Sequence, residues 1–279
     1  MTARDPEVDL LRCALPTETD PTLAERARKP FLKDACLEAL RTARADFTRA
    51  GPVLARWFRK TKKLGSRDRP IVAEAVWGII RHEHLLLRAG FHGDEFLHEG
   101  WCQMLEGNTF EHIQRATPPE DLSTAMSIPY DLAKEWLERL GPQASAQLAQ
   151  AMNQRAPLTI RANTNRCTRD ELQARLAEEK VTSEPCQMAP HGLHLLKRVN
   201  TQNLASFREG WFEIQDESSQ LFVESVIAAV QGRSTNIEDL KASGSQKGEL
   251  DPQTTILDVC AGSGGKSLAL AAVGAQVTA

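Results

Sequence analysis

From Asp34 onwards, apolar residues recur at steps of three and four, which is the spacing of one buried face of an α-helix. Asp34 belongs to the residue types that cap helices, and Pro52 and Pro70 stand where two later helices would begin. The preceding segment, residues 1–33, is polar and carries four prolines, so we expect a flexible arm there. The pattern predicts an all-helical domain over residues 34–125.

The pattern changes after the prolines at positions 118, 119 and 129. Residues 158–163 alternate between apolar and polar side chains, which is typical of a strand, and residues 192–196 predict a second strand. Between them, Thr168 is placed to cap a helix whose first turn is acidic. These elements predict a small α/β domain over residues 126–212.

The last part of the chain begins with a helix, predicted over residues 218–229. Residues 231–255 are polar and contain three glycines, and we expect a mobile surface insertion there. An apolar strand (256–259), a glycine-rich turn, a helix and the start of a second strand (275–278) follow. A strand, a glycine-rich turn, a helix and a second strand in this order are typical of the beginning of a cofactor-binding α/β sheet domain. Such a sheet needs further strands, so residues 213–279 are expected to form only its beginning.

Two generic nucleotide motifs fit this turn poorly. A dinucleotide loop of the form G-x-G-x-x-G requires glycine where Ser267 stands, and a phosphate loop G-x-x-x-x-G-K-S would have its first glycine at Cys260. Glycines after a strand still let the backbone approach a ligand closely, and the following helix N-terminus favours a negative group. The spacing alone indicates a nucleotide-type cofactor and leaves a purely structural turn open.

The specific string of this turn carries more information. Residues 257–267, LDVCAGSGGKS, closely resemble the S-adenosylmethionine loop of the Sun/Nop family of RNA (cytosine-C5) methyltransferases, RsmB type, which reads D-x-C-A-x-P-G-G-K-T. Residues 210–220 are similar to the family's entry into its catalytic domain, 156–163 to its small middle domain, and 65–81 to its N-terminal RNA-binding domain. The resemblance implies a multidomain fold: an all-α NusB-like N-terminal domain, a small α/β middle domain and a truncated Rossmann-like class I methyltransferase domain.

The resemblance implies S-adenosylmethionine as the cofactor. The implied cofactor-binding residues are Asp258, Cys260, Ala261, Gly262, Ser263, Gly264, Gly265 and Lys266. Ser263 stands where the family usually has proline, which makes the loop less rigid. Lys266 would reach the cofactor carboxylate or a nearby acid, or it is a solvated lysine of the first helical turn. Asp258 would hold the loop amides, which a plain loop cap would also do.

The family's two catalytic cysteines lie in later P-C-S-G and T-C-S motifs, and neither string occurs in this sequence. We therefore assign no catalytic residue, and Cys260 belongs to the cofactor loop. The chain is expected to correspond to the N-terminal portion of such an enzyme and to be inactive by itself. The implied reaction forms 5-methylcytosine in RNA, with ribosomal RNA as the expected substrate. The alternative is a non-enzymatic RNA-binding module.

A basic stretch over residues 56–69 contains one acid, Asp68, in a chain whose formal net charge is −3. Such local positive charge suits phosphate contacts. The predicted RNA-binding residues are Arg59, Lys62, Lys63, Arg67 and Arg69, together with Arg161 and Asn163 of the first predicted strand. The alternatives are a charged helix face with structural ion pairs and, for Arg161 and Asn163, an ordinary polar strand face.

Composition adds several exclusions. The chain is 41% hydrophobic and 25% charged, as in ordinary globular proteins, and no apolar run approaches the roughly 18 residues of a membrane helix. The six cysteines form no C-x-x-C pair and the seven histidines show no metal-ligand spacing, so we predict reduced thiols and no metal site. We expect a cytoplasmic monomer that contacts neither a membrane nor DNA.

Overall fold

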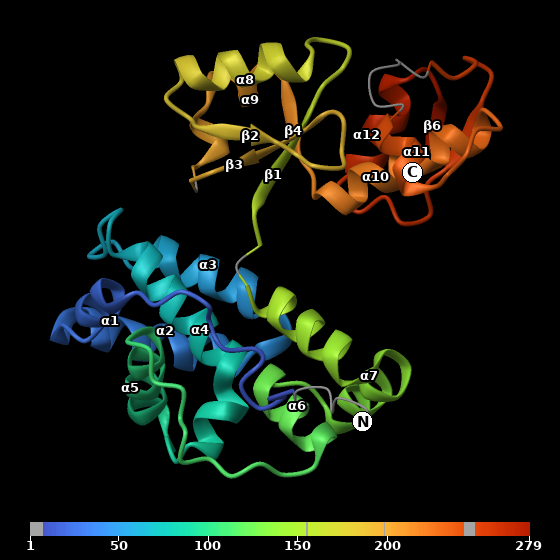
Figure 1. Ribbon diagram of the computed structural model, residues 1–279. Helices are drawn as coiled ribbons and strands as arrows, with labels where there is room; N and C mark the ends of the chain where they lie inside the picture. Colours follow the sequence, from blue (N-terminus) through green and yellow to red (C-terminus); the bar gives the residue numbers. More distant parts are fainter. Residues whose placement is uncertain (1–7, 155, 198, 243–248) are drawn as a thin grey trace. The chain divides into compact units, whose positions relative to one another are not determined.

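The computed structural model describes residues 8–154, 156–197, 199–242 and 249–279. The chain forms two compact units that meet between residues 155 and 156 (Figure 1). The first unit is helical, and the second combines an antiparallel sheet with a small parallel one. Within the described ranges, no helix combines the length and the apolar character needed to cross a membrane.

The first unit is built from helices, several of which carry a proline in their first turn. Its elements are α1 (Pro21–Ala27), α2 (Pro30–Ala45), the 3₁₀ turn η1 (Phe47–Arg49), α3 (Ala50–Lys60), α4 (Arg69–Arg88), α5 (Asp94–Leu105), α6 (Pro118–Met126) and α7 (Tyr130–Asn153). Proline lies in the first turn of α1, α2, α4 and α6, where its missing N–H costs no hydrogen bond. Helix α2 begins at Pro30, so Asp34 lies inside the helix and is not its cap.

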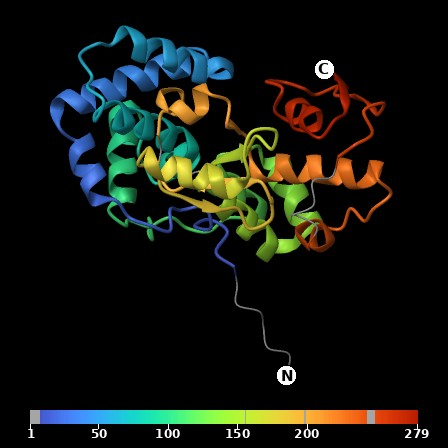
Figure 2. The ribbon, with the colours of Figure 1, turned by 90° about the horizontal axis from the view of Figure 1, so that it is seen from above.

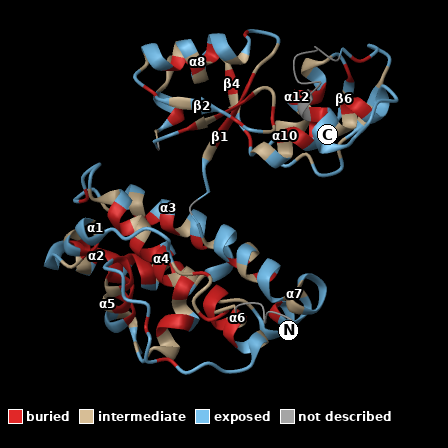
Figure 3. Cartoon of the chain, viewed as in Figure 1, coloured by how far each residue is buried: buried red, intermediate tan, exposed pale blue. Residues whose placement is uncertain are grey.

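Small residues bring the central helices of this unit together. Ala35, Ala39 and Ala43 form a buried stripe along α2. At Gly78 of α4, an added Cβ would lie 2.1 Å from Nε1 of Trp101 on α5. Only glycine therefore allows these two helices to approach this closely. Figure 3 shows the resulting core as a band of buried residues through α2, α4 and α5.

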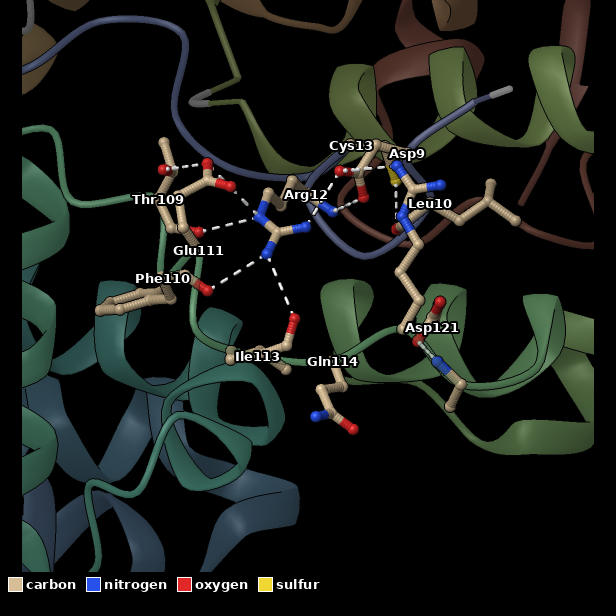
Figure 4. A network of polar contacts seen from close by, with 12 residues as sticks. Asp9, Leu10, Arg12, Cys13, Thr109, Phe110, Glu111, Ile113, Gln114 and Asp121 are labelled. Atoms are coloured by element: carbon tan, nitrogen blue, oxygen red, sulfur yellow. Dashed lines mark hydrogen bonds and ion pairs between the residues drawn. The ribbon is translucent and has the colours of Figure 1, made fainter. Parts of the chain in front are cut away.

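The expected loose arm is instead packed over its described part. Leu11 is fully buried, and the Arg12 guanidinium donates hydrogen bonds to the carbonyls of Phe110 (3.2 Å) and Ile113 (3.3 Å) (Figure 4). Helix α1 packs against α5. Pro21 and Pro30 of this segment begin helices α1 and α2, whereas the sequence prediction treated its prolines as a sign of disorder. Residues 1–7 lie outside the described residues.

The second unit begins with the predicted small α/β fold. Its elements are β1 (Leu158–Ala162), α8 (Arg169–Glu178), β2 (Ser183–Pro185), β3 (Gly192–Leu195), the 3₁₀ turn η2 (Thr201–Asn203), α9 (Ala205–Arg208) and β4 (Phe212–Ile214). The strands pair in the order β2-β3-β1-β4, all antiparallel. The predicted strands and helix of this region are confirmed, and Thr168 caps α8 in a reciprocal capping box with Glu171.

The rest of the second unit consists of α10 (Glu217–Val230), α11 (Ile237–Ala242), β5 (Thr255–Leu257), α12 (Gly265–Ala272) and β6 (Gln276–Thr278). Strands β5 and β6 pair in parallel, and α12 packs on α10 (Figure 2). Their core contains Ile227 of α10 and Leu270 of α12. Leu240 and Leu250 of the expected mobile insertion are buried, so its described ends pack; residues 243–248 lie outside the described residues.

The compact units divide the chain differently from the predicted domains. Helices α6 and α7 pack on each other, and α6 packs on α4, so both belong to the first unit, which extends to residue 155. The prediction placed a boundary at residue 126, because prolines surround that position. The small sheet begins only at Leu158.

Candidate cofactor loop and basic surface

The candidate cofactor loop joins the end of β5 to the start of α12. Gly264 caps α12 in the left-handed conformation with φ 88°, and Gly262 also has a positive φ of 56°. Residues with a Cβ rarely adopt such angles. The N–H of Gly264 donates to the carbonyl of Ala261 at 2.8 Å, which closes a tight turn. These two glycines therefore perform the turning function predicted for them.

Asp258 fixes both ends of this loop. Its Oδ1 accepts from the backbone N–H of Cys260 at 3.1 Å, and its Oδ2 accepts from the hydroxyl of Ser267 at 2.7 Å. The predicted hydrogen bond from Asp258 to a loop amide is confirmed. The same contacts are those of a loop cap, so a cofactor role for Asp258 stays a prediction.

The first turn of α12 offers free donors. The backbone N–H groups of Gly265, Lys266 and Ser267 have no acceptor among the residues that the structure describes. Unpaired N–H groups at a helix N-terminus favour a negatively charged ligand. The Lys266 side chain is half-buried and forms no ion pair within the described ranges. The first turn of α12 thus carries three amides and one cation that could bind a negatively charged ligand.

A buried glutamine lies against the loop and was not among the predicted site residues. Gln215 is 6% exposed, and neither its Nε2 nor its Oε1 has a hydrogen-bond partner in the described structure. An added Cβ at Gly265 would lie 3.7 Å from that Nε2. A buried amide without a partner is costly, so the arrangement suits a polar ligand beside Gly265. The sequence signal was the position of Gln215 inside the 210–220 string that resembles the family.

The surroundings of the loop are open. Leu257 is 68% exposed and Val259 is 81% exposed, although the sequence predicts an apolar strand of the type that sheets bury on both faces. Cys260 is also exposed. In the described structure, β5 pairs with β6 alone.

The basic stretch occupies the end of α3, the following turn and the start of α4. Arg59, Lys62 and Arg67 are exposed, and no ion-pair partner of these three lies in the described ranges. Lys63 lies 5.9 Å over the ring of Phe31. The expected free surface is therefore present at three of the five predicted positions.

The other basic residues of the stretch have structural contacts. Arg69 donates from Nε to the carbonyl of Leu64 at 3.2 Å. Asp68 pairs with Arg26 at 3.8 Å, and Arg26 also donates to the carbonyl of Arg67 at 3.2 Å. The alternative of structural ion pairs thus holds for Asp68, and Arg69 helps to fix the turn.

Arg161 and Asn163, which were predicted to contact RNA, have partners within the chain, and RNA contact by these residues stays a prediction. Arg161 is 5% exposed and donates to Oε2 of Glu213 at 2.8 Å. Asn163 donates to the carbonyl of Gly210 at 2.9 Å and accepts from the N–H of Asn165 at 3.2 Å. Helix α10 packs on β1, so the polar face of this strand is not a solvent face. Both side chains stabilise the sheet.

Two histidines of the first unit are core residues. His82 and His98 are buried, and burial lowers the pKa of His82 to about 3 and that of His98 to about 4. Both are neutral near pH 7. In the second unit the described residues do bring together a mixed group, Cys186, His194 and Glu217. The sequence prediction missed this group because its members are far apart along the chain.

The chain is similar in sequence to known ribosomal RNA methyltransferases. A family model described as "Methyltr_RsmF/B-like, ferredoxin-like domain" matches residues 128–202. Ribosomal RNA small subunit methyltransferase B of Pseudomonas putida is 27% identical over 136 residues, which cover 47% of this chain and 26% of that protein. The protein of the same name from Vibrio cholerae is 31% identical over 126 residues, covering 45% and 24%.

Over the matched residues, the chain is similar to the RsmB-type methyltransferases. The family model spans α7 and the first three strands of this chain, and thus crosses the boundary between its two compact units. The matched part covers about a quarter to a third of the curated relatives' length, 26% in Pseudomonas putida and 35% in Serratia proteamaculans. The crystal structure of PH0851 has a similar fold, with a TM-score of 0.55 at 15% identity, covering 92% of this chain and 61% of that one.

Proposed function

We propose that this chain, like the RsmB-type methyltransferases it resembles, binds S-adenosylmethionine at the loop between β5 and α12. We further propose that it binds RNA through the exposed cations at the end of α3 and in the following turn. The observation that carries the proposal is the turn itself. Asp258 ties Cys260 to Ser267, and the amides of the first turn of α12 have no acceptor within the described part of the chain. Such a turn can hold the carboxylate of the cofactor's methionine part.

Several residues would contact the cofactor. The amides of Gly265 and Lys266 would donate to its carboxylate, and the Lys266 ammonium would balance the charge. The orphan amide of Gln215, which lies beside Gly265, would gain a partner in the polar end of the same ligand. When bound, S-adenosylmethionine supplies a methyl group on a sulfonium. The protein contributes position and electrostatics.

The proposed reaction is methyl transfer to carbon 5 of cytosine in small-subunit ribosomal RNA. The names of the relatives support methyl transfer to small-subunit ribosomal RNA, and the choice of carbon 5 of cytosine rests on the resemblance of the loop string. Carbon 5 is a poor nucleophile, and a thiolate that adds at carbon 6 activates it. Once carbon 5 carries the methyl group, a base must remove the carbon-5 proton, so that the bond between carbon 6 and the thiolate breaks. Burial raises the pKa of Cys13, Cys36, Cys102 and Cys186 to about 12, so these thiols are poor candidates for that role.

The second candidate function is RNA binding without catalysis by this chain. It is favoured by one observation: the sequence contains neither P-C-S-G nor T-C-S, and its exposed cysteine, Cys260, is part of the loop that Asp258 holds. The residues of this chain would then bind and position RNA and cofactor only.

Equilibrium dialysis with radiolabelled S-adenosylmethionine tests the proposal. We expect the wild-type chain to bind the cofactor, and Asp258→Ala to weaken binding by about tenfold or more, because a hydrogen bond to a charged group contributes about 1.5–3 kcal/mol. The matched control is Asp251→Ala, since Asp251 also accepts from a nearby N–H in an exposed turn, that of Gln253 at 2.8 Å. Equal binding by wild type and Asp258→Ala would remove the loop as the site.

A further inference from the structure

Three metal-ligating side chains meet at the end of the small sheet where α10 begins. Cys186 directly follows β2, His194 lies on β3, and Glu217 is the first residue of α10. One ligand atom of each residue lies within 4.8 Å of those of the other two. The group is separate from the cofactor loop and from the basic stretch, and neither proposed function uses it.

Strand pairing places the thiol. Strands β2 and β3 are antiparallel, with Glu184 opposite His194, and the pairing continues as the N–H of Cys186 donates to the carbonyl of Gly192 at 3.0 Å. An added Cβ at Gly192 would lie 2.6 Å from Sγ of Cys186. Any larger residue at that position would push the thiol away, so the glycine keeps Cys186 beside β3.

The imidazole of His194 is held on one side only. Its Nδ1 lies 2.9 Å from Oγ1 of Thr159, the residue opposite it on β1. With the proton on Nδ1, the ring donates to Thr159 and leaves the lone pair of Nε2 free. Metal-ligating histidines are commonly fixed in this way by a partner on the other ring nitrogen.

The carboxylate of Glu217 is oriented in the same manner. Its Oε1 accepts from the N–H groups of Met188 (2.7 Å) and Ala189 (3.0 Å). Its Oε2 lies 3.5 Å from Nε2 of His194, which is long for a hydrogen bond. Two ligands of one tetrahedral zinc ion, at about 2.0–2.2 Å from the metal, are about 3.4 Å apart. The observed spacing suits a cation between these two atoms.

Charge and access agree with this arrangement. Burial, together with the charge of Glu217, raises the pKa of the Cys186 thiol to about 12, and a bound dication offsets both effects because it stabilises the thiolate. The side chains of His194 and Glu217 are 19% and 17% exposed. Solvent therefore reaches the group, and a water molecule can complete a tetrahedron.

We propose that Cys186, His194 and Glu217 form a binding site for a divalent cation of the zinc type, with water as the fourth ligand. Sulfur, imidazole nitrogen and carboxylate oxygen are the donor set that zinc accepts. The ion would fasten the end of the β2–β3 pairing to the first turn of α10. The site rests on this geometry and not on the proposed function, so either can fail without the other.

Cobalt substitution of the full chain tests the site. We expect metal-free protein to take up one Co²⁺ with a thiolate-to-cobalt charge-transfer absorption band, and Zn²⁺ to displace it. Cys186→Ser should abolish the band. Glu217→Gln keeps an acceptor for the N–H groups of Met188 and Ala189 and loses the ligand oxygen. It should weaken binding at least tenfold while the chain stays folded.

The matched control is Cys260→Ser, which removes an exposed thiol outside the group and should leave the band unchanged. Zinc should also raise the melting temperature of the wild type and not that of Glu217→Gln, because a ligand that binds only the native state stabilises it. Absence of the band in folded wild-type protein would overturn the proposal. So would a band that Cys260→Ser removes and Cys186→Ser keeps.

Discussion

The hydroxyl of Ser267 donates a 2.7 Å hydrogen bond to Oδ2 of Asp258. This bond connects the residue directly after β5 with the first turn of α12, across the glycine-rich turn. The other oxygen of the same carboxylate holds the N–H of Cys260. One side chain thus fixes the shape of a loop whose glycines could otherwise adopt many conformations.

RNA binding should depend on Arg59, Lys62 and Arg67, which are exposed and have no ion-pair partner among the described residues. Changing Arg59, Lys62 and Arg67 together to alanine should weaken binding of small-subunit ribosomal RNA and lower the slope of log K against log salt by up to about 2–3, because fewer counterions are released. Filter binding over a range of salt concentrations measures this slope. The matched control changes Arg49, Lys134 and Arg139, which are paired with acids; an equal effect of both triple variants would mean a non-specific charge effect.

The chain should not label RNA when incubated with radiolabelled S-adenosylmethionine and unmodified ribosomal RNA. Five of its thiols, Cys167 included, have a pKa that burial raises, and the exposed Cys260 belongs to the candidate cofactor loop. Labelling above background that disappears in Asp258→Ala would show that this chain catalyses the transfer itself. Labelling that persists in that variant would come from a contaminant.

Arg161 should matter for stability and not for RNA binding. Its buried guanidinium pairs with Glu213, and Arg161→Ala leaves a partly buried carboxylate without its partner, a loss of about 3 kcal/mol in the free energy of unfolding. Urea unfolding measures this loss, and Arg166→Ala, at an exposed position, is the control. RNA affinity of the folded Arg161→Ala chain should equal that of wild type; a large drop would restore Arg161 as an RNA contact.

The sequence predicted the elements around Arg161 well and its environment poorly. The alternation over 158–163 correctly indicates β1, and a strand with one polar face is ordinarily half exposed. Here Glu213 of β4 lies opposite Arg161 and α10 packs on the strand, so both faces are buried. Which element covers a polar face depends on tertiary contacts, which periodicity does not contain.

In the candidate sites too, local features could be predicted from the sequence and contacts between distant residues could not. Asp258 and the glycines of its loop act locally, within ten residues, and the sequence prediction assigned their structural roles. Cys186, His194 and Glu217 come together through strand pairing and a helix start, so no motif spacing indicates them. The described part of the expected arm is ordered for a related reason: Arg12 bonds to carbonyls about a hundred residues away in the chain.

Acid should destabilise the chain partly through His82. Burial lowers its pKa from 6.5 to about 3, so below pH 6.5 the unfolded chain binds a proton that the folded chain does not. Stability is therefore lost as pH falls from 6.5 towards 3, and between pH 7.5 and pH 5 this residue should cost about 2 kcal/mol. Urea unfolding of wild type and His82→Leu at both pH values measures the difference. Equal pH dependence of stability in the two proteins would mean that protonation of other residues causes the loss.

Amide resonances of the loop give the most direct test of the central claim, that the turn between β5 and α12 holds the cofactor. In ¹H–¹⁵N spectra of the full chain, titration with S-adenosylmethionine should shift the signals of Gly264, Gly265 and Lys266 and the side-chain amide of Gln215 most strongly. The amides of α4, in the first unit, should stay in place. Saturable shifts that leave these loop signals unchanged, or cluster in the first unit, would contradict the assignment of this loop as the cofactor site.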